Sequence, residues 1–291
     1  MGDVDEGDAE LVLEALQFAA HAQPGGSPLV VTIDVGNVDP LPIAVTDFIG
    51  EDSAATERGQ DIARVITNNL RNSGLFAPVD PNAFIEDINN IDLRPRFADW
   101  RVINASALLV GRVSVDDEGR LLVAFRLWDT AAEQQLLGMQ FTSVPENWRR
   151  LAHKVSDAIY ERLTGESGFF DTRIVYVSEG TGPEGEPTRR LVIMDQDGAN
   201  VSYLTDGQTM ALTPRFSPNG DLVTYMNFAE GNPQVYLLQL STGQQQRLAN
   251  VGAMTFAPRF SPDGGACWLR TVPVRYILDY GYIGSIYFRL I

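Results

Sequence analysis

The sequence has very few of the residues from which most catalytic and metal sites are built. Cys267 is the only cysteine, which excludes an internal disulfide and a zinc site of several cysteines. His21 and His153 are the only histidines, so a Ser-His-Asp or Cys-His centre would need one of them. His21 lies in a leader-like segment. His153 lies beside Arg150 and Lys154 on an expected helix, where we interpret it as a solvent-facing side chain. Because G-x-S-x-G is also absent, we predict no enzyme activity and no catalytic, cofactor or metal residues.

Basic side chains are scarce relative to acidic ones. The 291-residue chain has 22 Lys and Arg against 38 Asp and Glu, which gives a formal net charge of −16. Nucleic acids and anionic membrane surfaces attract the opposite sign, so this charge argues against both as partners. It is compatible with a basic protein partner. The apolar segment near the C-terminus is interrupted by Pro273, Arg275, Asp279 and Arg289, which argues against a membrane span.

The first 28 residues resemble a secretory leader only in part. Residues 11–20 are moderately apolar, and Ala20-His21-Ala22 has the small-x-small form of a signal-peptidase site. Five acidic residues and no basic residue precede that stretch, whereas a signal peptide begins with basic residues. We interpret residues 1–28 as a leader or an altered signal-peptide remnant, with cleavage of the intact gene product after Ala22. The alternative is an ordinary acidic leader with a chance A-x-A motif.

Residues 29–167 combine short β-type runs with two amphipathic helices. The runs expected to form strands are 29–34, 41–48, 75–79, 108–115, 121–128 and 136–141, the last three as an antiparallel meander. Helical spacing predicts a helix over 54–73 and another from about Glu146, with Ser143 and Glu146 at capping-box spacing. Two short helices are expected between residues 81 and 104. This pattern is typical of an α+β domain with a mixed sheet and two main helices.

A repeat without helices begins after Arg173. TPRFSPNGD starts at Thr213 and APRFSPDGG starts at Ala257, a shift of 44 residues. The same shift carries Leu191–Met194 onto Val235–Leu238. A period of this length, with strands and turns only, is typical of β-propeller blades, which bury their faces by stacking on neighbours. Residues 168–264 are therefore predicted to be an incomplete all-β propeller of about two blades.

Two motifs in the propeller region resemble ligand-binding sequences and are better explained as turns. GTGPEG, residues 180–185, matches G-x-G-x-x-G, but a strand rather than a helix follows it. Asp195, Asp197 and Asn200 suggest a calcium loop, but Asp206 stands where such a loop needs glutamate. The S-P-N-G and S-P-D-G segments at Ser217 and Ser261 are likewise predicted to be β-turns.

The phrases PRFSPNG and PRFSPDG, one blade apart, resemble the propeller repeats of the TolB family. Ahead of them, VVTIDVGNVDPLPIAVTDF, NLRNSGLFAPVD and ALLVGRV resemble the TolB amino-terminal domain. The resemblance covers about residues 29–264 in order. It implies a non-enzymatic periplasmic protein in which an α/β domain is joined to a six-bladed propeller.

The resemblance also implies partners, and no cofactor. TolB-like proteins bridge the inner-membrane protein TolA and the peptidoglycan-associated lipoprotein Pal. This Tol–Pal system supports outer-membrane integrity and cell division, and some bacteriocins use it for import. The TolA-facing segment of the family corresponds here to Val30, Val31, Thr32, Ile33 and Asp34. Pal docks at the central opening of the propeller, on loops from several blades.

Two departures from the family pattern stand out. About two blades are recognisable where the family has six, and the amino-acid composition changes after Gly264. Residues 265–291 hold one acid against three arginines, and four of the nine tyrosines. We interpret them as an aberrant tail, possibly frameshifted, of a chain truncated within the propeller; a divergent third blade is the alternative. Pal binding is accordingly expected to be lost in this chain.

A different class of protein also carries such propeller turns. The rival interpretation is the propeller portion of a secreted serine peptidase that has lost its catalytic domain. The α/β domain ahead of the repeats favours the TolB-like interpretation, because a simple peptidase cap would not need it.

Overall fold

The computed structural model describes residues 39–228, 232–248, 253–273 and 284–289. The chain forms two compact units that meet at Gly168 and Phe169, and each is described by itself. The expected leader (1–28), the expected strand 29–34 and the TolA-facing segment Val30–Asp34 lie outside the described residues.

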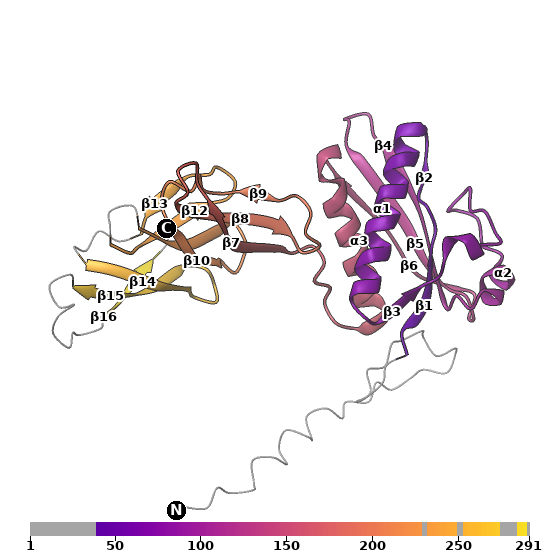
Figure 1. The fold of residues 1–291 in the computed structure, drawn as a ribbon. Coiled ribbons are helices and arrows are strands. Elements are labelled where there is room, and N and C mark those ends of the chain that lie inside the picture. The colour runs from indigo at the N-terminus through magenta and orange to yellow at the C-terminus, as the bar shows by residue number, and fades with distance from the viewer. Residues whose placement is uncertain (1–38, 229–231, 249–252, 274–283, 290–291) are drawn as a thin grey trace, which may run out of the picture. The chain divides into compact units, whose positions relative to one another are not determined.

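The first unit is built on a mixed six-stranded sheet, as predicted (Figure 1). Its strand order is β3-β1-β4-β5-β6, and the short β2 also pairs with β4. The three strands β3, β1 and β4 run parallel, and β4, β5 and β6 form the predicted antiparallel meander. The strands are β1 (Leu41–Val45), β2 (Ile49–Gly50), β3 (Phe76–Pro78), β4 (Ala107–Val115), β5 (Leu121–Asp129) and β6 (Gln134–Ser143).

Helices cover both faces of this sheet. The long helices α1 (Ser53–Asn72) and α3 (Trp148–Thr164) lie side by side on one face, and α2 (Phe97–Val102) lies on the other (Figure 1). Short 3-10 turns, η3 (Pro81–Ala83) and η4 (Pro145–Asn147), precede α2 and α3. On the α2 face, Trp100 packs against Leu108 and Val110 of β4 in a buried apolar cluster. The helices therefore follow the predicted pattern closely.

The predicted capping box at the start of the second long helix is wrong. Pro145 begins η4 instead, so α3 starts only at Trp148, and its N-cap residue Asn147 makes no side-chain capping bond. Ser143 is the last residue of β6, and its hydroxyl oxygen accepts a hydrogen bond from Asn147 Nδ2 at 3.3 Å. The proline fixes a 3-10 turn at the position where the capping box would require α-helical geometry.

The interpretation of His153 as solvent-facing is also wrong. Its side chain is 2% exposed, although the neighbouring Arg150 and Lys154 are exposed. Asn69 of α1 places Nδ2 2.9 Å from His153 Nδ1 and donates from the same nitrogen to Ser156 Oγ at 2.9 Å. Because α3 packs against both the sheet and α1, its buried face is wider than the single apolar stripe in its sequence suggests.

The second unit consists of three antiparallel sheets, as expected for propeller blades (Figure 1). No ring is closed among the described residues. The first sheet holds β7 (Arg173–Thr181), β8 (Pro187–Asp195) and β9 (Ser202–Tyr203). The second holds β10 (Ala211–Phe216), β11 (Leu222–Asn227), β12 (Gln234–Gln239) and β13 (Gln245–Arg247). The third holds β14 (Ala253–Phe260), β15 (Ala266–Pro273) and β16 (Gly284–Arg289).

The 44-residue repeat of the sequence is also a repeat of backbone geometry. Thr213 in β10 and Ala257 in β14 both have positive φ, 49° and 52°, and each lies at a register shift against the next strand. These are β-bulges at equivalent places. Residues 261–264 before β15 form the same kind of turn as residues 217–220 before β11, each closed by a glycine N–H that donates to the serine carbonyl at 2.9 Å. Residues 266–273 pair with β14 and therefore occupy the position of a blade strand. The frame-change interpretation of residues 265–291 stays a prediction.

Candidate functional site

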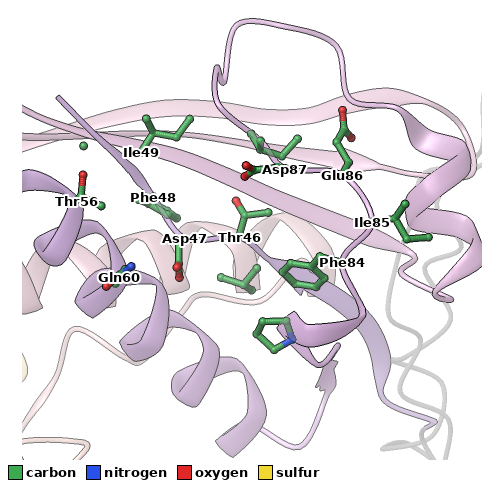
Figure 2. Close-up of a pocket in the computed structure, with 14 residues that line it drawn as sticks. Thr46, Asp47, Phe48, Ile49, Thr56, Gln60, Phe84, Ile85, Glu86 and Asp87 are labelled. Atoms are coloured by element: carbon green, nitrogen blue, oxygen red, sulfur yellow. The ribbon is translucent and has the colours of Figure 1, made fainter. Parts of the chain in front are cut away.

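A well-defined pocket lies in the first unit, at the carboxyl ends of β1 and β3 (Figure 2). Its volume is about 480 Å³, within the range of roughly 300–1,000 Å³ that is common for ligand pockets. One wall is formed by residues 45–50, which run from the last residue of β1 through β2. Thr56 and Gln60 of α1 add to it, and Pro81 with residues 84–88 forms the opposite wall.

The wall at residues 45–50 is held by close packing against α1 and β4. Thr46 donates from its backbone N–H and from Oγ1 to the carbonyl of Leu109, at 3.1 and 3.2 Å. The chain then places Phe48 in the core, where it is 1% exposed. A Cβ at Gly59 would lie 2.0 Å from the Phe48 carbonyl oxygen, and one at Gly111 would lie 2.3 Å from its ring. These glycines permit the approach that shapes the wall.

The opposite wall is anchored to α2. Phe84 stacks edge-on against Trp100 at a ring-centroid distance of 5.1 Å. Glu86 Oε2 accepts hydrogen bonds from Trp100 Nε1 at 2.7 Å and from the Arg96 backbone N–H at 2.9 Å. Both contacts fix the loop at residues 84–88, so the pocket has a formed shape.

The pocket is lined by both acidic and apolar side chains, and its exposed acidic residues form what we call the rim. Glu86 is paired with Arg96, at 3.6 Å. Asp47 and Asp87 are exposed and form no ion pair with any described residue. Figure 2 shows the two side chains, which come from opposite walls of the pocket. Such a site suits a partner that is partly apolar and carries positive charge.

Sequence reasoning did not single out these pocket residues. The available sequence signal was that Thr46-Asp47-Phe48 directly follows an apolar run. Residues that follow a parallel strand often line a ligand site. Two other acidic residues of the first unit form hydrogen bonds that stabilise local structure. Asp52 caps α1 by accepting from the Ala55 N–H at 2.7 Å. Asp116 accepts from the backbone N–H of Arg120 at 2.8 Å in the β4–β5 turn.

The motifs interpreted as turns are turns. In GTGPEG, the Gly182 N–H donates to the Glu186 carbonyl at 2.8 Å and closes the β7–β8 hairpin. At the calcium-like motif, the Gly198 N–H donates to the Asp195 carbonyl at 3.0 Å, and Asn200 donates to the Asp195 carboxylate. The carboxylate of Asp195 therefore stabilises a β-turn between β8 and β9.

Comparison with known proteins decides the family. Residues 29–136 match the model of the TolB amino-terminal domain, and residues 160–271 match that of the TolB beta propeller domain. The crystal structure of TolB from Acinetobacter baumannii superposes with a TM-score of 0.69 and 25% identity over 86% of this chain. The chain belongs to the TolB family. It spans 58% of the length of the Acinetobacter TolB.

Two other solved structures are only weakly similar to this chain. A putative TolB from Agrobacterium tumefaciens has a TM-score of 0.28 at 11% identity, covering 62% of this chain and 82% of its own. An acylaminoacyl peptidase from Pyrococcus horikoshii has a TM-score of 0.30 at 20% identity, covering 37% of this chain and 17% of its own. Among the described helices of the TolB-family chain, none is long and apolar enough to cross a membrane.

Proposed function

We propose that this TolB-family chain is a non-catalytic periplasmic scaffold of the Tol–Pal system, linking TolA in the inner membrane to the lipoprotein Pal. In that role it supports outer-membrane integrity and cell division. One observation carries the proposal. Matches to the two TolB domains occur in order in one chain, and a TolB structure superposes across both.

The two units offer separate binding surfaces for the two partners. The segment Val30–Asp34 precedes β1 in the sequence and is proposed to engage TolA, because it corresponds to the TolA-facing segment of the family and an extended segment can pair with a partner strand. In the family Pal docks on loops from several blades of a closed propeller. No ring is closed among the described residues, so we expect this chain to have lost that binding. Each unit has its own buried core, for example around Trp100 in the first and Tyr225 in the second, so each can present its surface independently.

A scaffold role is supported by the state of the reactive side chains. His153, the one histidine among the described residues, is buried between α1 and α3. Cys267 is buried in β15, and burial raises the pKa of its thiol, which disfavours the nucleophilic thiolate. Neither side chain lines the pocket of the first unit.

Calorimetric titration of the chain against the carboxy-terminal domain of TolA, and against Pal, tests the proposal. We expect TolA binding that Ile33→Asp weakens at least about tenfold, because a charge in the docking strand costs more than a surface substitution. Val102→Asp is the matched control, since Val102 is 78% exposed on α2. We expect Pal binding to be lost. Failure to bind TolA, TolA binding untouched by Ile33→Asp, or Pal binding at the affinity of a complete TolB would contradict the assignment.

A further inference from the structure

The pocket of the first unit lies beyond the end of the edge strand β3. β3 ends at Pro78, and its last hydrogen bond to β1 runs from the Val79 N–H to the Ile43 carbonyl at 2.9 Å. Alternate residues of a strand direct their backbone groups to opposite neighbours. Thr46 bonds to β4, so Val45 directs its backbone N–H and carbonyl toward the side where β3 has ended. Within the described part of the chain, no hydrogen bond continues that ladder to Val45.

The space beyond this strand edge is the pocket itself. Val45 lines one wall, and the loop at residues 84–88 keeps the opposite wall away from the edge. Phe84 and Ile88 are partly buried in the apolar cluster under that loop. Ile85, on the same wall, is 53% exposed. An extended peptide entering here would find unpaired backbone groups on one side and apolar side chains on the other.

The charge at the rim selects the kind of peptide. Asp47 and Asp87 contribute one exposed carboxylate from each wall, and neither has an ionic partner among the described residues. The formal net charge of −16 adds a long-range attraction for positive charge. An anionic ligand at the N-terminus of α1 is disfavoured, because the Asp52 carboxylate already accepts a hydrogen bond there.

We propose that this pocket is a strand-addition site for an extended segment of a protein partner that alternates lysine or arginine with apolar residues. The segment continues the line of β3 along the edge at Val45 and places its basic side chains between Asp47 and Asp87. The site shares no residue with the segments proposed for TolA and Pal binding, so it can fail while that function holds.

The test titrates the full chain with acetyl-Val-Lys-Val-Lys-Val-amide and follows the methyl signals of isoleucine and valine by NMR. We expect concentration-dependent shifts at Val45, Ile49, Ile85 and Ile88, with Ile193 and Val223 of the second unit unchanged. The same peptide with glutamate in place of lysine should give no shifts at the pocket. Shifts centred elsewhere, or equal shifts with the acidic peptide, would overturn the proposal.

Two further arms separate strand addition from other modes of binding. In an extended peptide, alternate backbone amides point to opposite sides, and only one side would face β1. N-methylation of the amides on that side should abolish binding, and N-methylation of the amides on the other side should preserve it. Equal effects of the two sets would exclude strand addition. Without peptide, the methyl signals of the pocket residues should not depend on protein concentration. If they do, a second copy of the chain occupies the pocket, and the proposed partner is wrong.

The charge contribution is tested with Asp47→Asn combined with Asp87→Asn, which should weaken binding of the lysine peptide about three- to tenfold. Asp117→Asn combined with Glu184→Gln removes the same charge from exposed turns and is the matched control. Equal loss in both double variants would show that only net charge matters and would reject a specific role for the rim.

Discussion

At the scale of single residues, the buried polar group between α1 and α3 is the least expected feature of this TolB-family chain. Asn69 is 1% exposed, and its Nδ2 forms hydrogen bonds with both His153 Nδ1 and Ser156 Oγ. Ser156 in turn donates to the Ala152 carbonyl at 2.9 Å. A buried polar group that loses its partner costs more than an exposed one. The group therefore fixes how the two helices pack against each other.

Removing the amide should destabilise the first unit. Asn69→Ala is expected to lower its free energy of unfolding by about 2 kcal/mol, because two buried side chains lose a hydrogen bond. Urea unfolding followed by tryptophan fluorescence measures this, since Trp100, Trp128 and Trp148 all lie in that unit. Asn68→Ala, at an exposed neighbouring position, is the control. Equal stability of the two variants would contradict the prediction.

The contact between Gly111 and Phe48 should show energetic coupling. Gly111→Ala is expected to cost about 1–3 kcal/mol of stability, because its Cβ would lie 2.3 Å from the Phe48 ring. In the double variant with Phe48→Leu, part of that cost should vanish, since the smaller side chain leaves space. Gly59→Ala should show no such recovery, because its Cβ meets the Phe48 carbonyl oxygen. Strictly additive costs for Gly111 and Phe48 would refute the coupling.

Asp116 should titrate below the usual range of an aspartate. The backbone N–H of Arg120, and further hydrogen bonds in the turn, lower the pKa of its carboxyl. A depressed carboxyl pKa gives a stabilising contribution that is present above the unfolded pKa and is lost as the pH falls through the folded pKa. We expect the amide signals of Glu118 and Arg120 to report an NMR midpoint below about 3.9. A midpoint at or above that value would contradict the assignment.

At the scale of elements, the blade turns show how a sequence repeat becomes a repeat of structure. Ser217 Oγ accepts from the Leu222 N–H at 3.0 Å, and Ser261 Oγ accepts from the Ala266 N–H at 2.9 Å. Gly220 and Gly264 adopt positive φ, 75° and 72°, at equivalent positions. Local hydrogen bonds of this kind are set by neighbouring residues.

The two serines should therefore be equivalent in their effect on hydrogen exchange. Ser217→Ala is expected to speed exchange of the Leu222 amide several-fold, and Ser261→Ala that of the Ala266 amide, because each loses its acceptor. Native-state exchange followed by mass spectrometry measures both. Ser241→Ala, at an exposed turn position, should change neither rate. A large effect in one blade and none in the other would show that the turns are not equivalent.

At the scale of the whole molecule, the two units have separate sheets and separate cores. We expect residues 39–168, produced alone, to unfold in one cooperative transition, because the apolar cluster around Trp100 and both long helices lie within them. Thermal circular dichroism measures this. A broad transition, or exposure of Trp100 to a fluorescence quencher, would contradict independent folding.

The sequence by itself determined the placement of most helices and strands and the blade repeat. Apolar periodicity and turn residues act over a few positions, so α1, the β4–β5–β6 meander and the S-P-x-G turns could be predicted directly. The start of α3 was missed because the expected capping box overlooked Pro145. The segment Val30–Asp34 stays a prediction.

Only the tertiary structure decided which side chains meet. His153 is buried because Asn69, 84 positions earlier in the chain, lies opposite it on α1. The pocket exists because β3 ends before β1 does and because Glu86 ties the next loop to Trp100. Contacts between residues so far apart in sequence leave no periodic pattern, since they depend on how whole elements pack.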